Sequence, residues 1–122
     1  MKMKKVLIVD DEPNIVMALE FLFRKSSFDV LIARNGTEAL ELLEGNVPDI
    51  ILLDIMMPDV DGYEICTTVR ADARMKATKV VFLSAKSKNT DIQKGYDLGA
   101  DLYVTKPFST RSLLKSVNEL LQ

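Results

Sequence analysis

Residues 49–62 read DIILLDIMMPDVDG, and this stretch sets the most apolar run of the chain directly before a carboxylate. The apolar run 50–53 is followed at once by Asp54, and Pro58 and Gly62 then punctuate the segment. A short apolar run bounded by turn residues is typical of a strand that is buried on both faces, as in a parallel sheet. The stretch therefore predicts a buried strand that delivers Asp54 at its carboxyl end.

Similar short apolar runs alternate along the chain with longer segments whose apolar residues recur every three to four positions, which is the spacing of a helix. The strand candidates are 5–9, 30–33, 50–53, 80–83 and 102–104. No repeat, linker or low-complexity tract interrupts this alternation. The pattern predicts one three-layer α/β domain over residues 1–122, with a parallel sheet and right-handed crossovers.

Composition limits the classes of function. The 122 residues are 48% hydrophobic and 28% charged, which suits one globular domain. Lys and Arg number 16 against 18 Asp and Glu, so the net charge of -2 offers no basic field for direct nucleic-acid binding. No apolar run is long enough for a signal peptide or a membrane span, and the single cysteine, Cys66, fits a reducing compartment. We expect a cytoplasmic protein without membrane contact.

The sequence contains no histidine. Nucleophile pairs of the Ser-His and Cys-His types are therefore excluded, as are the usual zinc sites built on histidine. Any chemistry must use carboxylates, hydroxyls, lysine and a hard cation.

Polar side chains follow four of the predicted strands: Asp10, Asp11, Asp54, Ser84 and Lys106. Taken singly, each reads as an ordinary loop residue or helix cap. In open parallel sheets, however, ligands bind beyond the carboxyl ends of the strands. Four strands that each deliver a polar group to the same edge indicate one shared site.

The chemistry of these groups points to phosphoryl transfer. Three carboxylates at one edge repel one another unless a cation lies among them or some stay protonated. Mg²⁺ takes one or two carboxylates and shares its remaining positions with water and phosphate. Asp54, held by a buried strand, is then the best-placed nucleophile toward phosphorus, with Lys106 and Ser84 available to the transferring group.

Four segments together resemble the signature segments of the response-regulator receiver domain, the CheY-like module of two-component signalling. They are VLIVDDE (6–12), DIILLDIMMPDVDGYE (49–64), VVFLSA (80–85) and GADLYVTKPF (99–108). The resemblance covers the whole chain. It implies a CheY-like, flavodoxin-like fold with five helices and a five-stranded parallel sheet of order 2-1-3-4-5.

The same resemblance implies roles for the clustered residues. Asp54 is the phosphoacceptor, and Lys106 is the lysine that contacts the phosphoryl group. Asp11 coordinates Mg²⁺ directly and Asp10 does so largely through water. Asp54 and the backbone carbonyl of Met56 complete the protein ligands.

Ser84 resembles the switch hydroxyl of the family and Tyr103 its switch aromatic. When Ser84 turns toward a phosphorylated Asp54, it vacates space that Tyr103 is expected to fill by swinging inward. Simpler roles stay open for both, as a strand-end hydroxyl and a half-buried strand aromatic. The Lys106–Pro107 bond is expected to be cis, as in the family. Glu12 is expected to be only a favourable charge at a helix start, although some members of the family use that position near the metal.

The function implied by resemblance is that of a signalling phosphoacceptor, not an enzyme, that loses its phosphoryl group slowly. Because the chain lacks histidine, the donor phosphohistidine must lie on a sensor histidine kinase or phosphotransfer protein. The output domain or target is unknown. Receivers related to OmpR and PhoB carry two successive acids before the switch aromatic, and here Leu102 replaces the second. A monomer or weak dimer is therefore expected.

Three other classes of protein share part of this pattern. A phosphatase of the haloacid dehalogenase type needs a second Asp two residues after the nucleophile, where this chain has Met56. A flavodoxin-like FMN carrier needs a glycine- and hydroxyl-rich loop after the first strand, where this chain has the acidic DDEPN. The remaining alternative is a pseudo-receiver, which acts only as a protein interaction module. A Mg²⁺ titration would distinguish it from a receiver with a functional acceptor site.

Overall fold

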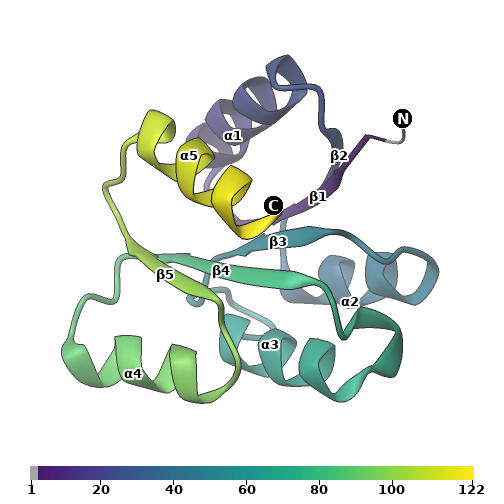
Figure 1. The fold of residues 1–122 in the computed structure, drawn as a ribbon. Helices are drawn as coiled ribbons and strands as arrows, with labels where there is room; N and C mark the ends of the chain where they lie inside the picture. Colours follow the sequence, from purple (N-terminus) through teal and green to yellow (C-terminus); the bar gives the residue numbers. More distant parts are fainter. Residues whose placement is uncertain (1–2) are drawn as a thin grey trace.

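The computed structural model describes residues 3–122, which form one parallel sheet covered by helices on both faces (Figure 1). Helices α1 and α5 lie on one face, and α2, α3 and α4 lie on the other (Figure 1). The strands are β1 (Lys5–Val9), β2 (Asp29–Ala33), β3 (Ile50–Leu53), β4 (Lys79–Ser84) and β5 (Leu102–Thr105). The helices are α1 (Pro13–Lys25), α2 (Gly36–Gly45), α3 (Gly62–Ala71), α4 (Asn89–Asp97) and α5 (Thr110–Leu120), with a short 3-10 helix η1 at Ala73–Met75.

The sheet order is β2-β1-β3-β4-β5, and every neighbouring pair is parallel. The predicted fold class and strand order are therefore confirmed. The strands β2, β4 and β5 are each one or two residues longer than their apolar cores indicated. Residues 1 and 2 of the expected domain 1–122 lie outside the described residues, so those bounds stay a prediction.

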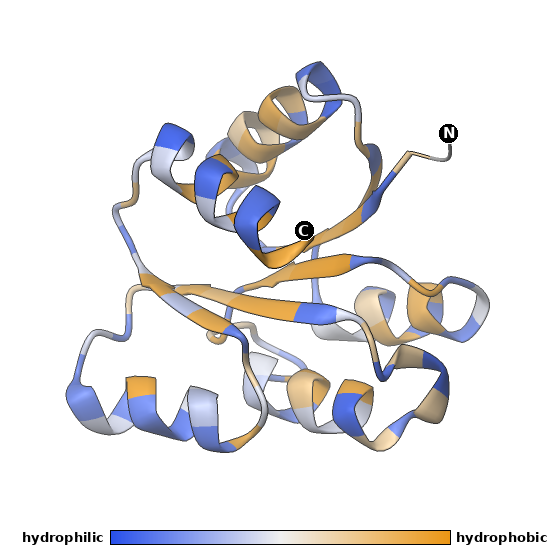
Figure 2. Ribbon diagram, in the orientation of Figure 1, coloured by the Kyte–Doolittle hydropathy of each residue, from blue (hydrophilic) through white to orange (hydrophobic). Residues whose placement is uncertain are grey.

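The central strands are apolar on both faces because each face packs against a layer of helices. Leu7 and Val9 of β1 face the core beneath α2 and α3, whereas Val6 and Ile8 face the core beneath α1 and α5. In β3, all four residues are fully or almost fully buried. Figure 2 shows this as continuous hydrophobic colouring along the central strands. The double burial fixes the carboxyl end of β3 in place.

Helix α3 approaches the end of β3 closely, and Gly62 makes this possible. Its backbone N–H donates to the carbonyl oxygen of Ile55 at 2.9 Å. A Cβ atom at position 62 would collide with the backbone oxygen of Asp54 and would lie 2.8 Å from the Cα of Ile55. The glycine therefore lets α3 pack against the backbone of the residue that ends the buried strand.

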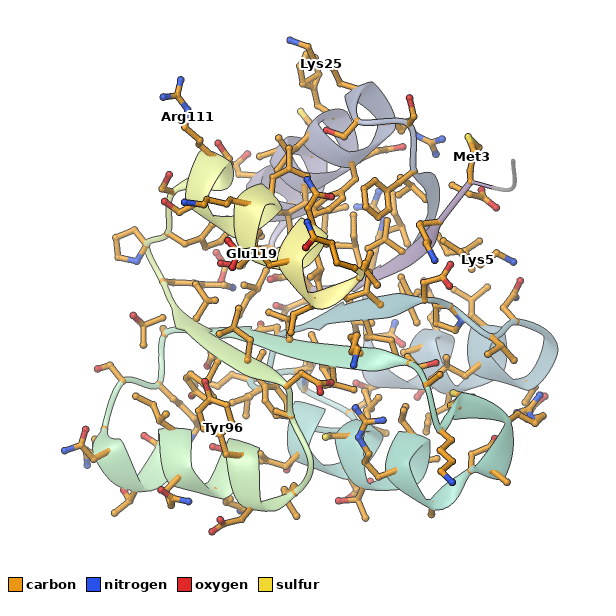
Figure 3. The ribbon with its side chains drawn as sticks, viewed as in Figure 1. Met3, Lys5, Lys25, Tyr96, Arg111 and Glu119 are labelled. Carbon is orange, nitrogen blue, oxygen red and sulfur yellow. The ribbon has the colours of Figure 1, made fainter. Side chains whose placement is uncertain are left out.

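Helix α4 is attached more lightly than the others. Its sequence NTDIQKGYD is mostly polar, and Gly95 is its one buried residue among those described. Its Tyr96 points toward β5 (Figure 3), where the Tyr96 hydroxyl accepts a hydrogen bond from the Tyr103 backbone N–H at 3.1 Å. A side chain on α4 thus satisfies a backbone N–H donor of β5, the edge strand of the sheet.

None of the helices in residues 3–122 has the length and apolar character that a membrane span requires.

Gly62→Ala should destabilise the protein, because the added methyl group meets backbone that cannot rotate away. We expect the free energy of unfolding to fall by about 2 kcal/mol, as for other overpacked sites. Gly45→Ala is the matched control, since nothing lies within 4 Å of its Cβ position and alanine favours a helix. Urea unfolding of both variants checks this, and equal stabilities would contradict it.

Candidate functional site

Three predicted site residues meet at the carboxyl edge of the sheet. Asp10 follows β1, Asp54 follows β3, and Lys106 follows β5. The Nζ atom of Lys106 lies 2.9 Å from Oδ2 of Asp10 and 3.8 Å from Oδ2 of Asp54. The side chain of Lys106 is 10% exposed, that of Asp10 is 2% exposed and that of Asp54 is 5% exposed. The ion pair is therefore shielded from water and weakly screened.

Glu12 belongs to the same cluster, whereas the sequence analysis favoured a plain helix-start charge and left a place near the metal as the alternative. Its Oε1 accepts a second hydrogen bond from Lys106 Nζ at 3.0 Å. Carboxylate oxygens of Asp10, Glu12 and Asp54 all lie within 4.8 Å of one another. Glu12 is also the N-cap residue of α1, as a helix-start charge would be. Its position directly after two acids at a strand end was the signal that could have placed it in the site.

Asp11 lies elsewhere. It is exposed and is not one of the three clustered carboxylates among the described residues. Instead it lines an adjacent pocket of about 540 Å³, together with Met56 and Lys86. The direct coordination of Mg²⁺ by Asp11 therefore stays a prediction, as does the role of the Met56 carbonyl.

Burial controls the electrostatics of the site. Burial, and next the negative charge of Asp10, raise the pKa of Asp54 to about 6, although Lys106 and the Met56 and Ile55 N–H groups oppose the shift. Burial also raises the pKa of Asp10. For Lys106, burial acts to lower the pKa, but its hydrogen bonds to Asp10 and Glu12 outweigh this and raise it. One lysine thus faces more negative charge than it can neutralise.

The donor set fits a hard divalent cation. All three clustered ligand groups are carboxylates, and two of them, Asp10 and Asp54, are buried. Mg²⁺ prefers oxygen ligands and commonly binds through one or two carboxylates. A bound Mg²⁺ would stabilise the ionised form of Asp54, which burial and the charge of Asp10 both disfavour.

The two predicted switch residues meet at the backbone of Lys86. Ser84 is fully buried, and its Oγ accepts a hydrogen bond from the Lys86 N–H at 3.1 Å. The Tyr103 hydroxyl donates to the Lys86 carbonyl at 2.7 Å. The loop between β4 and α4 is therefore held from both sides.

Tyr103 lies in an inward orientation in this structure. The expected movement of Tyr103 into space vacated by Ser84 upon phosphorylation of Asp54 stays a prediction. The tyrosine is 92% buried, with its ring centroid 5.8 Å from that of Phe82. The Lys86 carbonyl gives the tyrosine hydroxyl a hydrogen-bond partner in this buried position. The expected cis bond at Lys106–Pro107 is present.

Asp54→Asn should stabilise the protein above pH 6. The folded pKa of Asp54 is raised to about 6 from 3.8, so its ionised form destabilises the fold above pH 6 and its protonated form restores stability below about pH 4. We expect Asp54→Asn to increase the free energy of unfolding by on the order of 2 kcal/mol at pH 7.5, and by much less at pH 4.

Urea unfolding in the presence of a chelator at both pH values measures this difference. Asp72→Asn is the control with the opposite sign, because its hydrogen bonds with Arg74 lower the pKa of Asp72. A gain from Asp54→Asn that is the same at both pH values would contradict the argument.

Comparisons with known proteins agree with this geometry. The family model described as the response regulator receiver domain matches residues 6–118. A putative response regulator from Chloroflexus aurantiacus is 32% identical, with 98% of each chain covered and a TM-score of 0.91. The chemotaxis response regulator CheY4 of Vibrio cholerae is 31% identical, with 98% and 100% covered and a TM-score of 0.91. The Francisella response regulator 1452 receiver domain is 35% identical, with 97% and 96% covered and a TM-score of 0.89. The carboxylate cluster, the strand order and these matches together place this chain in the response regulator receiver domain family of two-component signalling.

Proposed function

We propose that this chain accepts a phosphoryl group on Asp54 from the phosphohistidine of a sensor histidine kinase or phosphotransfer protein. The observation that carries the proposal is the placement of Lys106 Nζ between Asp10 and Asp54 at the carboxyl edge of the sheet. A lysine held there is within reach of a group bonded to Asp54. The proposed location is the cytoplasm, without direct binding to nucleic acid or membrane.

Asp54 is the nucleophile in this proposal. Its carboxylate oxygen forms a bond to phosphorus as the bond between phosphorus and the donor imidazole nitrogen breaks, and that nitrogen keeps the electron pair. Lys106 donates to the phosphoryl oxygens as charge moves onto them. Ile55 fixes the orientation of the carboxylate, because its N–H donates to Asp54 Oδ1 at 2.8 Å.

Mg²⁺ is the proposed cofactor. Asp10, Asp11, Asp54 and the backbone carbonyl of Met56 are the proposed ligands, and Glu12 is close enough to Asp10 to share the site. When bound, the ion neutralises charge on the carboxylates and on the phosphoryl oxygens. The chain is a signalling phosphoacceptor in this proposal, and any loss of phosphate that it supports is slow.

The proposed readout runs through Lys86. Ser84 Oγ accepts from the Lys86 N–H, so a Ser84 hydroxyl that turns toward the phosphoryl group leaves that N–H without its partner. The Lys86 carbonyl is held by Tyr103, so a shift of this loop changes the contact between β5 and the start of α4. A charge event at Asp54 becomes a population shift on the α4–β5 surface, where the downstream target would bind.

The proposed phosphorylated state is a monomer or weak dimer. Asp101, the remaining acid before the switch aromatic, is engaged within its own chain. Its Oδ2 lies 2.9 Å from the Arg70 guanidinium and accepts from the Val80 N–H at 2.8 Å. An acid with these partners is poorly available to a second copy.

Incubation with acetyl phosphate and Mg²⁺ tests the proposal. Intact-mass measurement should find one added phosphoryl group, and neither Asp54→Asn nor a sample with excess chelator should be labelled. Light scattering of the labelled sample should find monomers. Stoichiometric labelling of Asp54→Asn would refute the acceptor assignment, and an unlabelled wild-type chain would favour the pseudo-receiver alternative.

The phosphoryl group should be lost slowly. Met56 is 57% exposed, and with Lys86 it lines the pocket beside the site, through which water would approach. A thioether is a weak acceptor and an ammonium group only donates, so neither residue can take a proton from attacking water. We expect Met56→Asn combined with Lys86→Glu to shorten the phosphoryl lifetime a few-fold, which corresponds to about 1 kcal/mol in the barrier. Decay of the labelled mass with time measures this, and a wild-type lifetime of seconds, unchanged in the double variant, would show the argument to be wrong.

A further inference from the structure

The loop that connects β3 to α3, residues 55–61, is closed at its base by a backbone hydrogen bond. Ile55 is buried, and its carbonyl accepts from the Gly62 N–H at 2.9 Å. The next residue, Met56, has an exposed side chain and carries the backbone carbonyl that we propose as a metal ligand. This hydrogen bond joins the two ends of the loop and does not hold the residues between them.

The far side of the loop is attached to the start of α2 by Asp59. One carboxylate oxygen, Oδ1, accepts from the Gly36 N–H at 3.0 Å. The other, Oδ2, accepts from the Thr37 N–H at 2.8 Å and from Thr37 Oγ1 at 2.6 Å. These donors hold the pKa of Asp59 well below its ordinary value, so the carboxylate stays ionised at neutral pH.

A close apolar contact lies beside these hydrogen bonds. A Cβ atom at Gly36 would lie 2.5 Å from the Cβ of Val60 and 2.6 Å from its carbonyl oxygen. Glycine at position 36 therefore lets the loop pack directly on the first turn of α2. The loop and the helix meet through a polar contact and an apolar contact that involve adjacent residues.

Helix α2 has a cap of its own and does not depend on Asp59 for one. Asn35 Oδ1 accepts from the Glu38 N–H at 2.8 Å, and Glu38 Oε1 accepts from the Arg34 N–H at 3.1 Å. Asp59 uses two further N–H groups of the first turn, where a negative charge is favourable. The main effect of the Asp59 hydrogen bonds is therefore to fix the position of the loop against α2.

We infer that Asp59 and Thr37 are positioning residues for the metal site, because they fix to α2 the loop that presents the Met56 carbonyl. The inference rests on the proposed function, in which that carbonyl binds Mg²⁺. Mg²⁺ demands near-ideal octahedral geometry, so a ligand that moves with a loose loop binds poorly. Neither side chain touches the metal in this inference.

Calorimetric titration with Mg²⁺ of the unphosphorylated chain tests the inference. Asp59→Asn should raise the dissociation constant by on the order of tenfold, the lower range for residues that support metal ligands. Thr37→Val keeps the charge and nearly the shape, removes only the Oγ1 bond, and should have a smaller effect in the same direction. The dissociation constant of the double variant should rise by less than the product of the two single-variant fold-changes, because both changes act on one contact.

Asp72→Asn is the matched control. Asp72 is also an exposed aspartate whose carboxylate accepts backbone and side-chain hydrogen bonds, in its case from Arg74, and it does not contact the loop. The affinity of Asp72→Asn for Mg²⁺ should stay within about twofold of wild type, because Asp72 is exposed and lies at the end of α3 opposite to the loop, where solvent screens its charge. Thermal unfolding in chelator shows that each variant is folded.

The outcomes separate this inference from the proposed function. Wild-type affinity in both Thr37→Val and Asp59→Asn would overturn the positioning role and leave the metal site intact. A wild-type chain that binds no Mg²⁺ would overturn both. An equal loss in Asp59→Asn and Asp72→Asn would show a general effect of charge and would also overturn the positioning role.

Discussion

The crowding of carboxylates around one lysine is the constraint on which the rest of this structure depends. Parallel strands that are buried on both faces deliver Asp10 and Asp54 to the same edge, where water cannot screen them. Lys106 reaches both, and also Glu12, but a single positive charge cannot balance three carboxylates. Burial, together with the negative charge of Asp10, therefore raises the pKa of Asp54. A site that lacks positive charge in this way favours the binding of a cation.

The backbone around Asp54 is unusually well supported for a segment that is mostly loop. Gly62 brings α3 against the end of β3, and Gly36 brings α2 against Val60. Both glycines are used because another backbone approaches too closely for a side chain, and neither has a positive φ angle. The segment after the acceptor is therefore packed between two helices. Its rigidity suits a role in holding ligands.

The opposite side of the site is lighter in construction. Helix α4 buries little apolar surface, and its position depends on hydrogen bonds that involve Tyr96, Tyr103 and Tyr63, whose hydroxyl donates to the Asp91 carbonyl at 3.1 Å. Contacts of this kind each contribute about 1 kcal/mol, so the helix can shift without loss of the core. The acceptor loop on one side of the site is rigid, and the helix α4 on the other side is lightly held. A change at the site is therefore expected to move α4 and not the loop.

The sequence by itself determined the strands, their burial and the residues at their ends. Apolar runs and helical spacing are local patterns, so they locate 50–53 and Asp54 without knowledge of any partner. The order of the strands came from the family resemblance, because the alternation of strands and helices alone permits several orders. The structure confirmed that order, together with the meeting of Asp10, Asp54 and Lys106.

Tertiary structure alone decided the contacts that join distant segments. Glu12 meets Lys106 across 94 positions of sequence, and Asp59 meets Thr37 across 22. The inward orientation of Tyr103 depends likewise on a carbonyl at Lys86. No periodicity encodes such pairs, because each depends on how separate elements pack in space. The sequence therefore identified which groups carry the chemistry, and the packing decided which of them touch.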